Sequence, residues 1–145
     1  MKPAIKRGSI VLTIKNKGNY TESNIQRDQI VLFRQNLQQL IKRVVALPGD
    51  TLQLVKGQLH IRNSDFQKII KLYSNTKIVG PWHLEYLLDE VNRIKYKPSN
   101  QNWGPIYIPQ RNYFVLGDNT SNSRDSRSIG YLREEEISQK ILIIF

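Results

Sequence analysis

Residues 40–62, LIKRVVALPGDTLQLVKGQLHIR, are the stretch that decides the fold. The first eight of them are apolar apart from Lys42 and Arg43, and Pro48-Gly49-Asp50 then follows with residues that are typical of turns. Beyond this turn, apolar and polar residues alternate on both sides of Lys56-Gly57, a pair that favours a two-residue hairpin in which glycine adopts a positive φ. The stretch therefore predicts a strand, a turn and a β-hairpin.

Further short strands are predicted on both sides of this stretch, each bounded by turn residues. They cover residues 9–15 (SIVLTIK), 29–34 (QIVLFR), 102–109 (NWGPIYIP), 113–116 (YFVL) and 141–145 (ILIIF), and we expect the last of them to be fully buried. Residues 133–136 are expected to form a single helical turn. Six or more short strands separated by turns predict a mostly β domain built on antiparallel sheets.

Residues 63–101 differ in character from the rest of the chain. Within them, Leu84, Leu87, Leu88 and Val91 recur at helical spacing, which predicts a helix over about 82–95. We therefore expect a β core made of residues 1–62 and 102–145, with residues 63–101 as a small insert that contains one helix.

The composition is that of one globular domain of 145 residues, with 39% hydrophobic and 23% charged residues, so wholesale disorder is excluded. The absence of cysteine excludes disulfides, thiolate metal sites and a cysteine nucleophile. The two histidines, His60 and His83, are too far apart in sequence to suggest a metal site. We expect neither a metal nor a cofactor.

The formal net charge of +10 has three readings: a nucleic-acid partner, an anionic membrane surface, or a generally basic proteome. A nucleic-acid-binding sheet should interleave aromatic with basic residues on one face. Trp82, Trp103 and Tyr107 lie instead in or beside the predicted insert, where core packing explains them better, so no nucleic-acid partner is expected. The sequence contains no run of 18 consecutive apolar residues, so it predicts no membrane-spanning helix. The first 15 residues do not resemble a signal peptide.

Lys42 stands out because it lies among apolar residues of a predicted strand. Leu40, Lys42 and Val44 alternate along that strand and share one face. The lysine is therefore either an edge charge that reaches water or a partly buried amine. Burial would lower the pKa of the amine and allow it to act as a base. The residues by themselves leave both possibilities open.

Residues 113–131, YFVLGDNTSNSRDSRSIGY, form the second notable stretch. An apolar strand ends at Gly117-Asp118, and the residues after it are mostly Ser, Thr, Asn, Arg, Asp and Gly, which favour turns. Such a segment is either a solvated loop or a functional loop that the strands hold in place.

Read together, the segments IKRVVALPGDTLQL (41–54) and YFVLGDNTSNSRDSR (113–127) resemble the two C-terminal signature boxes of type I signal peptidases. These are membrane-bound serine proteases with a Ser/Lys dyad. MKPAIKRGSIVLTIK (1–15) and QRDQIVLFR (26–34) are similar to further segments of that family, so the resemblance covers nearly the whole chain. It implies the family's antiparallel β catalytic domain.

The resemblance also implies roles for individual residues. Lys42 corresponds to the general base, and Ser123 to the serine whose hydroxyl orients that amine. Asp125 and Arg127 correspond to a pair that braces the loop near the site, and Gly117 with Asp118 to the turn that brings the loop under the lysine strand. Substrate is expected in shallow apolar pockets beside Met1, Pro3 and Ile5.

In the family, the nucleophilic serine immediately precedes the methionine that corresponds to Met1, and a membrane anchor lies before it. We therefore expect both upstream of Met1, and the chain as given to be inactive without them. The sequence departs from the family pattern at four places: Ala4 for Thr, Ser9 for Asp, Asp28-Gln29 for Gly-Asp, and Gln139 for Gly.

Two functions are consistent with these features. The favoured one is a membrane-associated endopeptidase that removes signal peptides from secretory pre-proteins on the outer face of a membrane. The alternative is a catalytically inactive homologue that binds signal peptides or acts as a scaffold.

Overall fold

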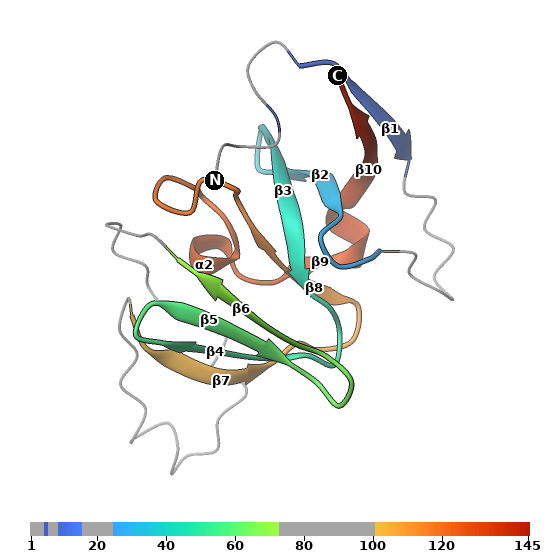
Figure 1. The fold of residues 1–145 in the computed structure, drawn as a ribbon. Helices are drawn as coiled ribbons and strands as arrows, with labels where there is room; N and C mark the ends of the chain where they lie inside the picture. Colours follow the sequence, from blue (N-terminus) through green and yellow to red (C-terminus); the bar gives the residue numbers. More distant parts are fainter. Residues whose placement is uncertain (1–4, 6–8, 16–24, 73–100) are drawn as a thin grey trace.

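The computed structural model describes residue 5 and residues 9–15, 25–72 and 101–145, apart from the side chain of residue 143, and arranges their strands in two sheets (Figure 1). All neighbouring strands run antiparallel, as the sequence predicts. The predicted helix over 82–95 and most of the predicted insert lie outside the described residues, so this division of the chain stays a prediction.

The larger sheet has six strands in the order β1-β10-β2-β3-β8-β9. Its strands are β1 (Val11–Lys15), β2 (Ile30–Gln35), β3 (Gln38–Ala46), β8 (Asn112–Leu116), β9 (Leu132–Arg133) and β10 (Ile137–Ile144). β3 lies near the middle, between β2 and β8. Lys42 pairs with Val31 of β2, and the pairing of β3 with β8 begins at the next residue, Arg43.

The smaller sheet has four strands in the order β6-β5-β4-β7. It contains β4 (Thr51–Val55), β5 (Gln58–Arg62), β6 (Gln67–Lys71) and β7 (Trp103–Tyr107). The predicted hairpin is formed by β4 and β5, and both of its turn residues have positive φ, 49° at Lys56 and 75° at Gly57. Figure 1 shows this sheet packed beside the ends of β3 and β8.

Helical structure is limited to two short segments in the described residues. Helix α2 (Ser126–Ile129) follows the polar loop after β8, and the 3-10 turn η2 (Glu134–Glu136) coincides with the predicted helical turn. The side chain of Asp125 caps α2 by accepting a hydrogen bond from the Arg127 N–H. Sequence reasoning treated 117–130 as loop throughout, because a four-residue helix carries no periodicity.

The hydrophobic core lies on both faces of β3 and β8. One cluster joins the four-stranded sheet to Val45, Ala46, Phe114 and Leu116. The other cluster covers the opposite face and includes Val31, Phe33, Val44, Tyr113, Val115, Leu132 and Ile137. Lys42 shares the face of Val44, whereas Arg43 shares the face of Val45 and points toward the smaller sheet.

One strand was not predicted, and one expectation is wrong. β6 falls inside the predicted insert, yet all five of its residues pair with β5. The closing strand is not fully buried, since Leu142 is 54% and Phe145 74% exposed. The smaller sheet packs on β3 and β8, so β1 and β10, at the far end of the six-stranded sheet, have one face uncovered in the described part of the chain.

Candidate active site

The loop after β8 is organised around a buried carboxylate, that of Asp125. It accepts hydrogen bonds from the Gly117 N–H (3.0 Å) and from Nε and Nη2 of Arg127 (2.8 and 2.9 Å). Asp125 is fully buried and Arg127 is only 2% exposed. A charge buried this deeply is tolerated only when it is paired and hydrogen-bonded. Because the Asp125 carboxylate bonds Gly117 at one end of the loop and Arg127 at the other, it holds both ends in one arrangement.

Two small residues allow the loop to lie close to β8. The Ser126 hydroxyl accepts a hydrogen bond from the Val115 N–H at 2.9 Å, which ties the start of α2 to the strand. A Cβ on Gly117 would lie 2.0 Å from Ser123 Oγ and 2.6 Å from Ser123 Cβ. Ser123 therefore packs directly on Gly117, and only glycine leaves room for it.

Lys42 projects from β3 opposite Val31 of β2 and is partly buried. Burial lowers the pKa of this amine from its ordinary value of 10.5. The Asp125 carboxylate raises the pKa, Arg127 lowers it and Asp118 raises it, but the net result stays below the ordinary value. Three charged residues in and after the loop that follows β8 thus shift the pKa of Lys42. Burial has the largest effect and favours the neutral amine that a base requires.

Two polar atoms of the same loop lack hydrogen-bond partners. Within the described residues, Ser123 Oγ and Arg127 Nη1 are buried and make no hydrogen bond. A hydrogen bond between Ser123 and Lys42 is therefore not formed in this structure, and the orienting role of Ser123 stays a prediction. Unpaired buried polar atoms are costly, and a functional site is one place where proteins retain them.

Asp118 links the loop to the other face of β3. Its carboxylate forms a bidentate pair with Arg43, at 2.9 Å to Nε and 3.0 Å to Nη2. Arg43 also donates through Nη1 to the carbonyl oxygen of Asp28 at 2.8 Å. Sequence reasoning missed the part played by Arg43, whose only signal was its position beside Lys42.

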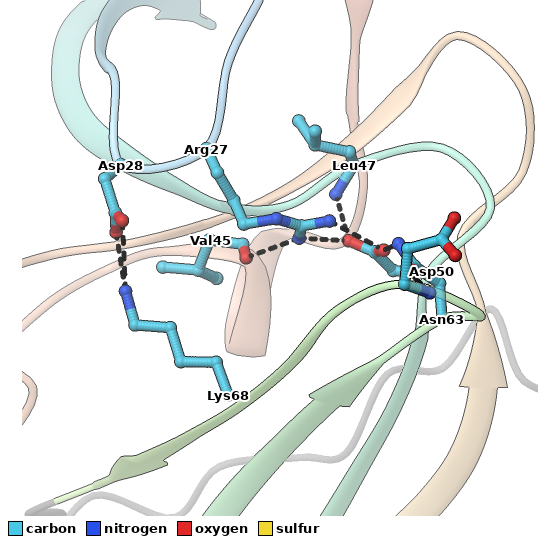
Figure 2. Close-up of polar contacts among 8 residues, drawn as sticks. Arg27, Asp28, Val45, Leu47, Asp50, Asn63 and Lys68 are labelled. Atoms are coloured by element: carbon cyan, nitrogen blue, oxygen red, sulfur yellow. Dashed lines mark hydrogen bonds and ion pairs between the residues drawn. The ribbon is translucent and has the colours of Figure 1, made fainter.

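A second buried carboxylate, Asp50, lies at the junction of the two sheets (Figure 2). It receives hydrogen bonds from both terminal nitrogens of Arg27, from the Leu47 N–H (2.7 Å) and from Asn63 Nδ2 (2.7 Å). The Arg27 guanidinium also stacks 3.9 Å from the centre of the Phe66 ring. Burial raises the pKa of Asp50, but these hydrogen bonds and the charge of Arg27 outweigh it and hold the pKa below 3.8. Sequence reasoning identified Asp50 only as a turn residue.

Of the three residues expected beside the substrate pockets, the structure describes one. Met1 and Pro3 lie outside the described residues, and Ile5 is partly buried in a bend. The expected substrate pockets beside these three residues therefore stay a prediction. In the described part of the chain, no group of three or more His, Cys, Asp or Glu side chains is arranged to hold a metal ion.

A family model described as "Signal peptidase, peptidase S26" matches residues 1–145. The chain belongs to this family of signal peptidases. The resemblance seen in the signature boxes around Lys42 and Ser123 is thereby confirmed for the chain as a whole.

Individual relatives agree with this assignment. Signal peptidase I V of Bacillus subtilis is 32% identical over 143 residues, which cover 94% of this chain and 75% of the relative. Signal peptidase I of Bacillus amyloliquefaciens is 31% identical over 85% of this chain, which spans only 60% of that relative's length. Against signal peptidase I of Rickettsia bellii the chain spans 50% of the relative.

Among solved structures, a signal peptidase I from Enterococcus faecalis matches with a TM-score of 0.50 and 26% identity, covering 83% of this chain and 98% of the other. The described residues of this chain form a mostly antiparallel β architecture of two sheets, with one short α-helix. None of the helices in the described residues is long and apolar enough to span a bilayer.

Proposed function

We propose that this chain is the catalytic part of a signal peptidase I, a serine endopeptidase that removes signal peptides from secretory pre-proteins. In this proposal the natural protein is anchored to a membrane and cleaves on its outer face. The relatives that match are named signal peptidase I, which supports the substrate class. The proposal involves no metal, cofactor or nucleic acid.

The single observation that carries the proposed mechanism is the partly buried Lys42 amine, whose pKa is lowered beside the loop of Asp125 and Arg127. A neutral amine can take the proton of a serine hydroxyl as that hydroxyl attacks the scissile carbonyl, and can later return the proton to the leaving amine. The attacking serine is expected immediately upstream of Met1.

Ser123 is proposed to position the Lys42 amine. Its unpaired Oγ supports this role, because a buried hydroxyl without a partner is free to accept or donate one hydrogen bond when the site is assembled. Gly117 and the Asp125–Arg127 pair would keep that hydroxyl in place.

The test is to replace Lys42 in the full-length protein and measure cleavage of a pre-protein. Lys42→Met keeps the length and apolar stem of the side chain but removes the base, so the rate should fall by about 10²–10⁴-fold. Lys15→Ala, at the exposed end of β1, is the control and should cleave at the unchanged rate. Thermal unfolding of both variants should match that of the unaltered protein.

Cleavage that persists in Lys42→Met would refute Lys42 as the base. An unaltered full-length protein that binds signal peptides but never cleaves them would instead support the inactive homologue.

A further inference from the structure

One edge of the six-stranded sheet is formed by β1 (Val11–Lys15), which pairs with β10 alone in the described part of the chain. Figure 1 shows this strand on the outside of the molecule, with β10 on its inner side. The pairing has one irregularity, and the extra residue belongs to β10, since Leu12 pairs with residue 143 and Thr13 with Ile141. β1 itself is therefore a regular strand.

The register shows which backbone groups of β1 face outward. Just before the strand, Ile10 and Phe145 exchange both backbone hydrogen bonds, at 3.1 and 2.8 Å. Neighbouring residues of an edge strand point their backbone groups to opposite sides, so Leu12 and Ile14 face β10 as Ile10 does. The N–H and C=O groups that face away from the sheet are those of Val11, Thr13 and Lys15.

The side chains along this edge are apolar on one face of the sheet. Ile10, Leu12 and Ile14 alternate along the chain and share that face, and they are 72%, 50% and 51% exposed. Edge strands are usually protected from further pairing by charged residues or proline. β1 contains no proline, and Lys15 at its end is its one charged residue. The edge is thus both apolar and unprotected.

The same edge is complementary to itself. Two copies of β1 can pair antiparallel with Thr13 opposite Thr13, and Val11 of each copy then lies opposite Lys15 of the other. All the outward-facing backbone groups obtain hydrogen-bond partners in this register. Leu12 of one copy lies opposite Ile14 of the other in a non-hydrogen-bonded pair, where side chains approach most closely. A two-fold interface requires such a match of one surface with itself.

We propose that β1 pairs with β1 of a second copy of this chain, which joins two six-stranded sheets into one. A lipid surface would suit the apolar side chains, but hydrocarbon does not tolerate the unpaired N–H and C=O groups of a strand edge. A second strand satisfies these groups and covers Leu12 and Ile14 at the same time. The inference goes beyond the proposed function, because β10 and β2 separate β1 from the strand that carries Lys42.

Cysteine cross-linking tests the register, because the chain contains no cysteine of its own. Thr13→Cys places two cysteines in a directly opposed pair with Cα atoms about 5.5 Å apart, a separation that a disulfide spans. Lys15→Cys is the matched control on the same edge, since its two copies would lie four residues apart, or about 14 Å.

The variants are oxidised in the full-length protein in its membrane, and the unaltered protein gives the background. Thr13→Cys should form a disulfide-linked dimer at least about tenfold faster than Lys15→Cys, because only the first pair meets the geometry of a disulfide. Equal rates for the two variants, or no dimer in either, would overturn the proposal.

A charge exchange tests whether Leu12 faces Ile14 of the second copy. One variant carries Leu12→Lys with Ile14→Lys, and the other carries Leu12→Glu with Ile14→Glu. Like charges directly opposite each other destabilise a strand pair, whereas opposite charges stabilise it. Each variant alone should therefore be monomeric, and an equimolar mixture should form dimers. Leu37→Lys, which removes an 87% exposed leucine from the turn between β2 and β3, is the control and should dimerise as the unaltered chain does.

Sedimentation equilibrium of the 145-residue chain measures this association. A five-residue edge buries less than the roughly 1,200 Å² of a stable interface, so a weak dimer is expected, and the chain is studied at about 0.1–1 mM. About 0.3 M salt screens the net charge of +10 that each copy carries. Dimers in either charged variant alone, or none in the mixture, would overturn the proposal.

Lipid is the other candidate for covering this apolar face. An unaltered chain that stays monomeric at about 1 mM, in the range of weak contacts, would overturn the proposal. Binding of that monomer to phosphatidylcholine vesicles, lost with Leu12→Lys and Ile14→Lys, would then assign the face to a lipid surface.

Discussion

The described part of the protein contains two aspartate–arginine pairs with a buried carboxylate, Arg27–Asp50 and Asp125–Arg127. They differ in how completely their polar atoms are hydrogen-bonded. Asp50 is surrounded by donors from three separate parts of the chain, which join the two sheets (Figure 2). Arg127 leaves Nη1 without a hydrogen-bond partner, and Ser123 Oγ in the preceding loop is also unpaired among the described residues.

We infer from this difference that Arg27–Asp50 is a structural pair and that Asp125–Arg127 belongs to the proposed site. A saturated buried network gains nothing from further binding and mainly fixes how the elements pack. An incomplete network keeps polar groups that a neighbouring amine or a substrate can use, at some cost in stability. The region around Asp50 is therefore expected to govern folding, and the region around Asp125 and Lys42 to govern chemistry.

The largest effect on stability is expected from Asp50→Ala. It leaves the Arg27 guanidinium, the Leu47 N–H and Asn63 without their acceptor, so the free energy of unfolding should fall by about 3–5 kcal/mol. Urea denaturation measures this. Asp65→Ala is the control, because Asp65 is an exposed turn residue close by in the β5–β6 turn and should change stability by no more than about 0.5 kcal/mol. Similar losses in both variants would contradict a structural role for the Asp50 network.

A smaller loss of stability but a clear loss of activity is expected from Gly117→Ala. The new methyl group would overlap Ser123, so the free energy of unfolding should fall by about 1–3 kcal/mol and cleavage should slow as the hydroxyl is displaced. Introducing Ser123→Gly removes the overlap, so the double variant should regain the stability lost in Gly117→Ala without regaining activity. Additive stability losses in this double-mutant cycle would show that the two residues do not interact.

The smallest effect is expected from Asp118→Asn, and it should appear in the pH dependence. The Asp118 carboxylate raises the pKa of Lys42, so its removal lowers that pKa and keeps the amine neutral at lower pH. The rise of kcat/KM with pH should therefore begin at a lower pH than in the unaltered protein. Asp28→Asn is the control, since Asp28 also contacts Arg43 but is not among the charges that shift Lys42. A profile that moves to higher pH, or that moves equally in both variants, would contradict this account.

Local sequence patterns predicted much of the fold. Alternation around Lys56-Gly57 predicted β4 and β5, and turn residues predicted the end of β3 at Pro48-Gly49-Asp50. These signals depend on neighbours two to four residues apart, which is the range over which strand alternation and turn preferences act. β6 was missed because its sequence, QKIIK, is short and lies beside a region of different character.

The sequence by itself determined most of the strands and turns, the family, and the residue types of the candidate site, because these follow from short-range patterns. Only the tertiary structure decided which charges meet. Arg43 and Asp118 are 75 residues apart in sequence, and Arg27 and Asp50 are 23 apart, yet each pair is in contact. Such contacts, like the partial burial that lowers the pKa of Lys42, depend on how the sheets and the loop after β8 pack together, and no local pattern encodes that packing.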